Sequence, residues 1–287
     1  MFEALEAEII FSQFVQSFSN ASLDQFFLAI TWLGNPILWI GIAAFLYWKG
    51  DEKKSFFLMT TILFATAVVG ILKPLIGRIR PSEEMFRVLD KLTESQYSFP
   101  SGHATTIAGV FGYYWEKFAR KARITGLIIV LIVLLSRIYL GAHFFGDVLV
   151  GALFGFLIGR LVHYFEQNYA KIRFNQKKLL EEIGLLSAII LALLVSFEFR
   201  QLELSMGLIG YFAGIFTFKL INMDSQRLSG QKLWIKQFFG FAGLGIIGLT
   251  GYEYDLLPIA LFIGGTWITF IYPAIYEKLR RKQDLIT

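Results

Sequence analysis

Long runs of apolar residues, separated by short charged stretches, are the feature that most limits the folds open to this chain. A helix needs roughly 20 apolar residues to cross a hydrocarbon core about 30 Å thick. Nine runs are long enough, at residues 25–48, 55–77, 101–119, 124–142, 145–165, 182–199, 204–221, 234–250 and 256–276. The composition agrees, since 55% of residues are hydrophobic and only 17% are charged. The sequence therefore predicts an all-α, polytopic integral membrane protein with about nine transmembrane helices.

The first 20 residues follow a different pattern. They contain three glutamates and no Lys or Arg. Their apolar side chains recur at roughly helical spacing, at Phe2, Leu5, Ile9, Phe14 and Phe18. This pattern is typical of an amphipathic helix that lies on the membrane surface rather than crossing it.

Basic residues gather at one set of ends of the predicted spans. Of the 27 Lys and Arg residues, 20 flank this set and seven flank the other. Because cytoplasmic loops carry the excess of Lys and Arg, the richer set is expected in the cytoplasm, together with the C-terminus. We expect a location in the cell (plasma) membrane. The net charge of +5 is then a consequence of topology, and no nucleic-acid partner is predicted.

A basic stretch at residues 166–178 is the best candidate for a domain boundary. Before it, residues 1–166 would form a core with the surface helix and five spans. After it, residues 179–287 would form a four-span region that carries no recognisable motif. The candidate functional residues all fall in the first part.

Three short polar stretches interrupt the apolar pattern, at residues 73–81, 100–103 and 136–147. The first ends the second span, the next opens the third, and the last joins the fourth to the fifth. Between His103 and Ser136 the chain crosses the membrane and returns, so all three stretches reach the same face. Ionisable residues at such a depth usually mark a functional site, and here they converge. By the charge count, this face is the outer one.

The residue types in these stretches suit a phosphate group. Lys73, Arg80 and Arg137 supply three positive charges, and the two guanidinium groups match the geometry of phosphate oxygens. Ser101 and Gly102 lie where a helix begins, so backbone N–H groups there can also face an anion. Gly102 has no side chain and lets a ligand approach the backbone. The sequence therefore predicts a phosphate-binding site.

Two histidines and an aspartate provide the groups for catalysis. His143 and Asp147 are four residues apart, so on a helical turn the carboxylate would orient the imidazole. The other ring nitrogen would then be available as a nucleophile. His103 would lie across the pocket and protonate the leaving oxygen. This combination predicts phosphoryl transfer through a phosphohistidine.

Each of these residues also has an ordinary explanation when it is taken alone. Lys73 and Arg80 are suited to extending from a helix end toward the interface. His143 could be a packed histidine neutralised by Asp147. Ser101 could simply begin a helix. These separate explanations do not account for three stretches that reach the same face and carry residue types suited to phosphate. The catalytic interpretation is therefore preferred for these residues taken together.

Other polar residues near the spans fall outside this pattern. Arg78 and Arg87 are close to it in sequence and are expected to be solvated. His163 lies near the opposite end of its span and is expected at the membrane interface. Asn35 and Pro36 interrupt the first span and predict a kink there.

The pattern K-x6-RP, then PSGH, then SR-x5-H-x3-D resembles that of the type 2 phosphatidic acid phosphatase (PAP2) superfamily. The match covers about residues 25–165 and comprises Lys73, Arg80, Pro81, Pro100, Ser101, Gly102, His103, Ser136, Arg137, His143 and Asp147. This family includes lipid phosphate phosphatases, bacterial polyprenyl diphosphate phosphatases, glucose-6-phosphatases and vanadium haloperoxidases.

The resemblance implies a role for each matching residue. His143 would be the nucleophile, Asp147 its partner and His103 the acid. The phosphoryl group would be held by Lys73, Arg80, Ser101, Gly102 and Arg137. The resemblance also implies a metal-independent phosphatase without a cofactor.

The expected substrate is a lipid phosphate or a polyprenyl (di)phosphate, because a site at the membrane edge favours an amphiphile whose tail stays in the bilayer. The expected partners are therefore a phosphorylated lipid and the membrane lipids. A glucose-6-phosphatase-like sugar phosphatase is an alternative, since nine spans with the motifs in the first half also fit that layout. A lipid phosphotransferase is another, with a hydroxyl acceptor in place of water. A transporter or lipid-binding protein with an inactive site is the alternative from a different class.

Overall fold

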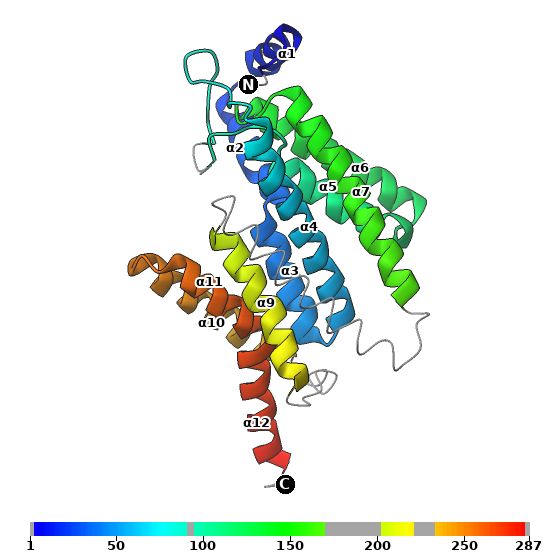
Figure 1. Ribbon diagram of the computed structural model, residues 1–287, viewed down its shortest axis with the longest axis vertical. Helices are drawn as coiled ribbons and strands as arrows, with labels where there is room; N and C mark the ends of the chain where they lie inside the picture. The colour runs from blue at the N-terminus through cyan, green and yellow to red at the C-terminus, as the bar shows by residue number, and fades with distance from the viewer. Residues whose placement is uncertain (1–2, 91–94, 170–201, 221–232, 285–287) are drawn as a thin grey trace. The chain divides into compact units, whose positions relative to one another are not determined.

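The computed structural model describes residues 3–90, 95–169, 202–220 and 233–284, and within these ranges the chain is helical apart from loops and one isolated bridge (Figure 1). The helices are α1 (Glu6–Ser17), α2 (Ala21–Ile30), α3 (Pro36–Lys49), α4 (Glu52–Ile76), α5 (Gly102–Tyr114), α6 (Arg120–Tyr139), α7 (Phe145–Tyr169), α9 (Leu202–Leu220), α10 (Leu233–Glu253), α11 (Leu257–Thr266) and α12 (Tyr272–Asp284). The expected all-α class is confirmed for this part of the chain.

Five helices in the described ranges are long and apolar enough to cross a membrane, and there are six spans if α2 and α3 are counted as one bent span. The five are Glu52–Ile76, Arg120–Tyr139, Phe145–Asn168, Leu233–Glu253 and Leu257–Lys278. One expected span corresponds to a shorter helix, since α5 has 13 residues. The expected span at 204–221 corresponds to α9, in which Ser205–Phe218 forms an apolar segment. The expected span at 182–199 lies outside the described residues. The count of nine spans stays a prediction.

The first expected span is bent by 52° between α2 and α3. A short 3-10 helix, Thr31–Gly34, follows α2, and Asn35 then leaves the helical conformation. The Oδ1 atom of Asn35 accepts a hydrogen bond from the N–H of Ile37 at 2.9 Å. Pro36 begins α3, a position where its missing N–H removes no helical hydrogen bond. The kink that the sequence predicts at Asn35 and Pro36 is confirmed.

The chain forms two compact units. The first comprises Met1–Trp39 and Phe64–Asn168, and the second comprises Ile40–Leu63 and Tyr169–Thr287. The change of unit after Asn168 falls within the basic stretch at 166–178. Residues 40–63 pack with the C-terminal part, and the predicted division into residues 1–166 and 179–287 stays a prediction.

The second unit is held together by hydrogen bonds to a π-helical turn, Trp267–Ile271. The indole N–H of Trp48 donates to the carbonyl oxygen of Ile268 at 2.8 Å, and the hydroxyl of Tyr47 donates to that of Thr269 at 3.0 Å. A π-helical turn widens the backbone ring and changes the normal helical pairing, which allows side chains to reach these carbonyl groups. Residues 40–63 therefore belong to the core of this unit.

In the first unit α5 is buried along its length, and α7 packs closely beside it (Figure 1). Three glycines of α7 make this approach possible. A Cβ atom added to Gly151, Gly155 or Gly159 would lie 2.8, 2.1 or 2.0 Å from a carbonyl oxygen of the α5 segment. These glycines have a packing role, because only small residues let two helical backbones come so close. The contact places the first turn of α5 beside the first turn of α7, where the N–H of Ser101 donates to the carbonyl of Asp147 at 3.0 Å.

Candidate active site

The first motif stretch leaves α4 through a tight turn at Gly77. Its N–H donates to the carbonyl of Lys73 at 2.9 Å, and its φ of 65° lies in the left-handed region that favours glycine. The chain then pairs in antiparallel fashion with residues 96–98, through a bridge between Ile79 and Tyr97. This turn directs Arg80 back toward the site.

A second left-handed turn, at Gly141, places His143 between α6 and α7. Gly141 has a φ of 71°, and a Cβ atom there would lie 2.4 Å from the carbonyl oxygen of Arg87. The N–H of His143 donates to the carbonyl of Arg137 at 3.2 Å. The last turn of α6 thus fixes the backbone of the histidine.

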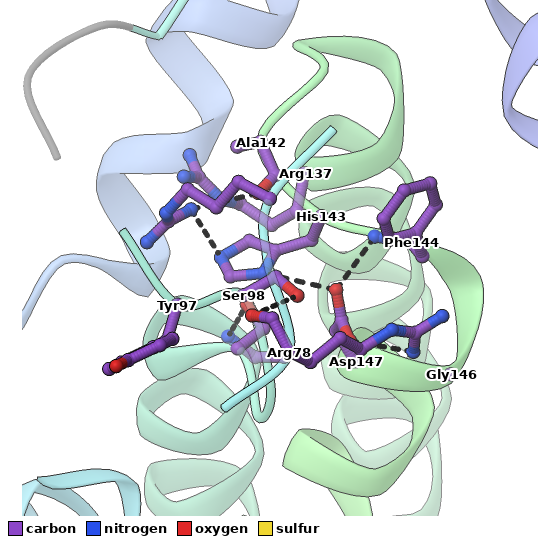
Figure 2. A network of polar contacts seen from close by, with 12 residues as sticks. Arg78, Tyr97, Ser98, Arg137, Ala142, His143, Phe144, Gly146 and Asp147 are labelled. Atoms are coloured by element: carbon purple, nitrogen blue, oxygen red, sulfur yellow. Dashed lines mark hydrogen bonds and ion pairs between the residues drawn. The ribbon is translucent and has the colours of Figure 1, made fainter. Parts of the chain in front are cut away.

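The imidazole of His143 is buried, and each of its nitrogens faces a different group (Figure 2). Nε2 lies 3.3 Å from Nη1 of Arg80, and Nδ1 lies 3.6 Å from Oδ2 of Asp147. Arginine can only donate, so Nε2 is the acceptor and the proton of the neutral ring is assigned to Nδ1. Nε2 therefore carries the lone pair, on the side where the arginine lies.

Asp147 is completely buried in the first turn of α7 and accepts hydrogen bonds through both carboxylate oxygens. Its Oδ2 atom accepts from the N–H of Phe144 at 2.8 Å, as Figure 2 shows. Its Oδ1 atom accepts from Nη1 of Arg78 at 2.9 Å. The carboxylate thus has a fixed orientation toward Nδ1 of His143.

Arg137 is buried in the last turn of α6. Its Nη1 donates to the hydroxyl of Thr31 at 2.7 Å, and its Nη2 lies 2.7 Å from Oδ2 of Asp90. Asp90 compensates the buried charge, since an unpaired guanidinium would be costly at this depth.

Arg80 and Lys73 are held by backbone carbonyl groups. Arg80 donates from Nη1 to the carbonyl of Ala142 at 2.8 Å and from Nε to that of Ser95 at 2.7 Å. The Nζ atom of Lys73 donates to the carbonyl of Tyr97 at 3.0 Å. Neutral partners leave both positive charges available to an anion.

The electrostatic field of these cations acts on His143. Burial lowers the pKa of His143 well below the usual histidine range, and the charges of Arg80, Arg137 and Lys73 lower it further. Burial, followed by the charge of Arg137, also lowers the pKa of Arg80 to about 10. At neutral pH the imidazole is therefore uncharged, whereas the guanidinium of Arg80 keeps its charge.

The PSGH stretch forms the start of α5. Ser101 is the N-cap residue, and its side chain accepts from the N–H of Ala104. A Cβ atom on Gly102 would meet no protein atom closer than 3.8 Å, so protein packing does not fill this space. His103 is partly exposed and within electrostatic range of Arg137 and His143. The structure thus brings the eight predicted site residues into one region of the first unit.

The expectation that Arg78 is solvated is wrong. Its side chain is 1% exposed and forms salt bridges with both Asp147 and Glu8. The sequence pattern singled out none of Arg78, Glu8 and Asp90 as part of the site. Glu8 lies on α1. An acid within an amphipathic helix and an arginine near two motif cations resemble ordinary surface residues in sequence, so no local signal distinguishes them.

Two other expectations concern residues away from this cluster. Arg87 is about half exposed, as expected, but its Nη2 also lies 2.5 Å from Oδ2 of Asp24. His163 is buried within the protein, and its Nε2 lies 3.0 Å from Oε2 of Glu116. The pair belongs to a charged cluster at the far ends of α5 and α7.

Comparisons with known proteins agree with the motif pattern. The family model of the PAP2 superfamily matches residues 54–171. The chain is 29% identical over 157 residues to a lipid A 4'-phosphatase of Porphyromonas gingivalis, covering 49% of this chain and 65% of that protein. It is 32% identical over 173 residues to phosphatidylglycerophosphatase B of Bacillus subtilis, covering 54% of this chain and 80% of that protein.

A solved structure shares the fold. The crystal structure of Aquifex aeolicus LpxE has a TM-score of 0.50 with this chain at 24% sequence identity, and it covers 56% of this chain and 98% of that one. With the apolar helices described above, these likenesses identify an integral membrane protein. The family model, the relative matched over 80% of its length and the three motif stretches together show that the chain belongs to the PAP2 superfamily.

Proposed function

We propose that this protein is a membrane phosphatase that removes phosphate from a lipid through a phosphohistidine on His143. The observation that carries the proposal is the environment of that imidazole. Nε2 faces Arg80 at 3.3 Å, Nδ1 faces Asp147 at 3.6 Å, and three cations surround the ring. This arrangement keeps the ring neutral and directs its lone pair toward an anion-binding region.

In the first half of the reaction, Nε2 of His143 attacks phosphorus while the bond to the leaving oxygen breaks. His103 donates its proton to that oxygen, and Asp147 stabilises the positive charge that develops on the ring. Lys73, Arg80 and Arg137 stabilise the charge on the equatorial oxygens.

In the second half, water attacks phosphorus and gives a proton to His103, and the bond between phosphorus and Nε2 breaks. Phosphate then leaves, and His143 is again neutral. The N–H of Ser101 itself donates to the carbonyl of Asp147, so the backbone N–H groups that follow it, from Gly102 on, would face the phosphoryl group at the start of α5. Because fixed cations supply the positive charge, the reaction is proposed to need no metal ion.

A phosphorylated lipid is the proposed substrate. The two relatives described above are named for lipid A and for phosphatidylglycerophosphate, both of which are membrane lipids. The exposed apolar face of α1 also supports a site close to lipid. Ile10, Phe14 and Phe18 project from this helix and are each more than half exposed. We propose that α1 lies in the membrane interface, as the N-terminal pattern predicts.

The function is tested with purified protein and a panel of phosphatidate, phosphatidylglycerophosphate, lipid A, polyprenyl diphosphate and glucose 6-phosphate, with and without EDTA. We expect phosphate release from at least one lipid, no loss with EDTA, and no turnover by His143→Ala. Release from glucose 6-phosphate alone would favour the sugar phosphatase. Transfer to an added alcohol instead of water would favour the phosphotransferase. No release from any substrate would contradict the proposal.

A further inference from the structure

One carboxylate of α1 reaches into the candidate active site. Oε1 of Glu8 accepts from the N–H of Gly146 at 2.7 Å, in the first turn of α7. The same carboxylate pairs with Nη2 of Arg78 and lies 3.5 Å from its Nη1. Arg78 in turn donates to Asp147 at 2.9 Å. Glu8 therefore contacts both the helix that carries Asp147 and the arginine that holds it.

The charges in this chain of contacts alternate. Asp147 and Glu8 are negative, and Arg78 lies between them. Burial would raise the pKa of Glu8, but the hydrogen bonds from Arg78 and from backbone N–H groups lower it below the usual range, so the carboxylate is ionised at neutral pH. Arg78 alone would neutralise Asp147. With Glu8 present, the cluster keeps a net negative charge beside Nδ1 of His143.

We propose that Glu8 is a positioning residue of the active site, which acts through Arg78 and Gly146 to hold Asp147 and to preserve its negative charge toward His143. The proposal rests on the proposed role of His143 as nucleophile. It makes α1 a functional part of the phosphatase site and not only a membrane anchor.

The ordinary explanation is that Glu8 attaches α1 to the rest of the unit. That task is already carried out at the other end of the helix by Gln16. Its Nε2 donates to the carbonyls of Arg87 at 2.8 Å and Tyr139 at 3.0 Å, and its Oε1 accepts from the N–H of Arg87 at 3.0 Å. Attachment does not require an ionised carboxylate at 2.7 Å from the residue that precedes Asp147.

Gly146 leaves just enough room for the carboxylate of Glu8. A Cβ atom added there would lie 2.6 Å from Oε1 of Glu8 and 3.4 Å from Nη1 of Arg78. Glycine at this position therefore lets the carboxylate approach the start of α7. It also provides a second way to disturb the contact without changing any charge.

The effect on His143 depends on all the charged groups that face it. Positive charges come from Arg80, Arg137 and Lys73, with Asp90 opposite Arg137. Asp147 faces Nδ1, with Arg78 and Glu8 behind it, and His103 lies on α5. Removal of the charge of Glu8 leaves this balance more positive at Nδ1. The Nδ1–H tautomer then loses support, and the positively charged ring of the phosphohistidine is less stabilised.

The test is Glu8→Gln in the full-length protein, with Glu6→Gln as the matched control, since Glu6 is exposed on the same helix. For Glu8→Gln we expect kcat on the best lipid phosphate to fall about tenfold to a hundredfold with little change in KM, by analogy with the loss seen when the hydrogen-bond partners of metal ligands are removed. Glu6→Gln should behave as the parent protein. Thermal unfolding of each variant establishes that it is folded.

A second readout does not depend on turnover. The chain has three histidines, so 15N spectra of histidine-labelled protein at neutral pH can report the tautomer of His143. We expect the parent protein and Glu6→Gln to show the Nδ1–H form, and Glu8→Gln to show an increased Nε2–H population. If Glu8→Gln is unstable, Gly146→Ala should produce the same change in the spectrum and in kcat.

The two proposals fail in different ways. If the parent protein releases no phosphate but Glu8→Gln still changes the tautomer, the proposed function is wrong and the positioning role stands. If the parent protein is active, the role of Glu8 is overturned by an unchanged kcat, or by a lower kcat with an unchanged 15N spectrum. The double variant Glu8→Gln/Arg78→Gln should be no slower than Arg78→Gln alone, because Glu8 acts through Arg78. If the losses in kcat of the two single variants multiply in the double variant, the two residues act independently and the proposal is contradicted.

Discussion

The two nitrogens of His143 have opposite surroundings, and the difference determines what the residue can do. Arg80 faces Nε2 and can only donate a hydrogen bond, whereas Asp147 faces Nδ1 and can only accept one when ionised. Burial among cations keeps the ring neutral, which is the state required of a nucleophile. The same cations would bind the phosphoryl group, so one set of charges has both effects.

This environment predicts the acid limb of the pH profile. Because the pKa of His143 is lowered, first by burial and then by Arg80, the neutral ring persists as the pH falls below 6.5. We therefore expect kcat/KM, which reports groups of the free enzyme, to stay high at pH 6.5 and to fall only in more acidic solution. Removal of a cation in Arg80→Gln should move this limb to higher pH, in addition to a loss of rate of about 10²–10³.

Arg87→Gln is the control for that experiment. Arg87 is about half exposed and pairs with Asp24, so its loss should leave the acid limb unchanged. An acid limb at or above pH 6.5 in the parent protein, or the same limb in Arg80→Gln, would contradict the electrostatic explanation.

At the scale of elements, the site depends on the close approach of α5 and α7. The N–H of Ser101, at the start of α5, donates to the backbone of Asp147 in α7. Three glycines of α7 keep the two backbones together along the buried length of α5. The glycine spacing and the catalytic geometry are therefore linked, although the glycines touch no reacting group.

A methyl group in this contact should separate the helices. In Gly155→Ala the new Cβ would lie 2.1 Å from the carbonyl oxygen of Thr105, so we expect a loss of stability of about 1–3 kcal/mol. Thermal unfolding in one detergent measures the loss, and phosphatase activity should fall with it. Gly245→Ala is the matched control, because a Cβ there meets nothing within 4 Å. Equal unfolding temperatures for the two variants would show that the glycine contact is unimportant.

At the scale of the whole molecule, the eight predicted site residues lie in the first unit, and the second unit packs around residues 40–63 and the C-terminal helices. The boundaries of these units do not follow chain order. Helix α4 contributes its first half to the second unit and its second half, which ends near Lys73, to the first. Truncation of the chain after residue 166 would therefore remove packing partners of residues 40–63.

The orientation of the chain is tested by labelling introduced cysteines, since the protein has none of its own. Glu84 is exposed in the loop near the site, and Lys121 is exposed at the opposite end of the first unit. We expect Glu84→Cys to react with an impermeant reagent in whole cells and Lys121→Cys to react only after permeabilisation. The reverse pattern would show that the active site faces the cytoplasm.

Features that depend on a local pattern of residues could be predicted from the sequence. Apolar runs indicated the helical membrane class, and Asn35 with Pro36 indicated the kink in the first span. Motif spacing also indicated that Lys73, Ser101 and His143 reach one region. Lys73 ends one span and Ser101 opens the next, and the chain crosses the membrane and returns between Ser101 and His143. Each of these follows from the length of a span or from the geometry of a helix.

Tertiary structure alone decided which ordinary-looking residues support the site. Glu8 is 70 residues from Arg78 in the chain, and Thr31 is 106 residues from Arg137, so neither pair leaves a local signal. Burial then changes their effect, since an ion pair that contributes little on a surface fixes geometry and charge when it is shielded from water. Sequence identified the residues that would meet the phosphate, whereas the fold determined the residues that hold them in place.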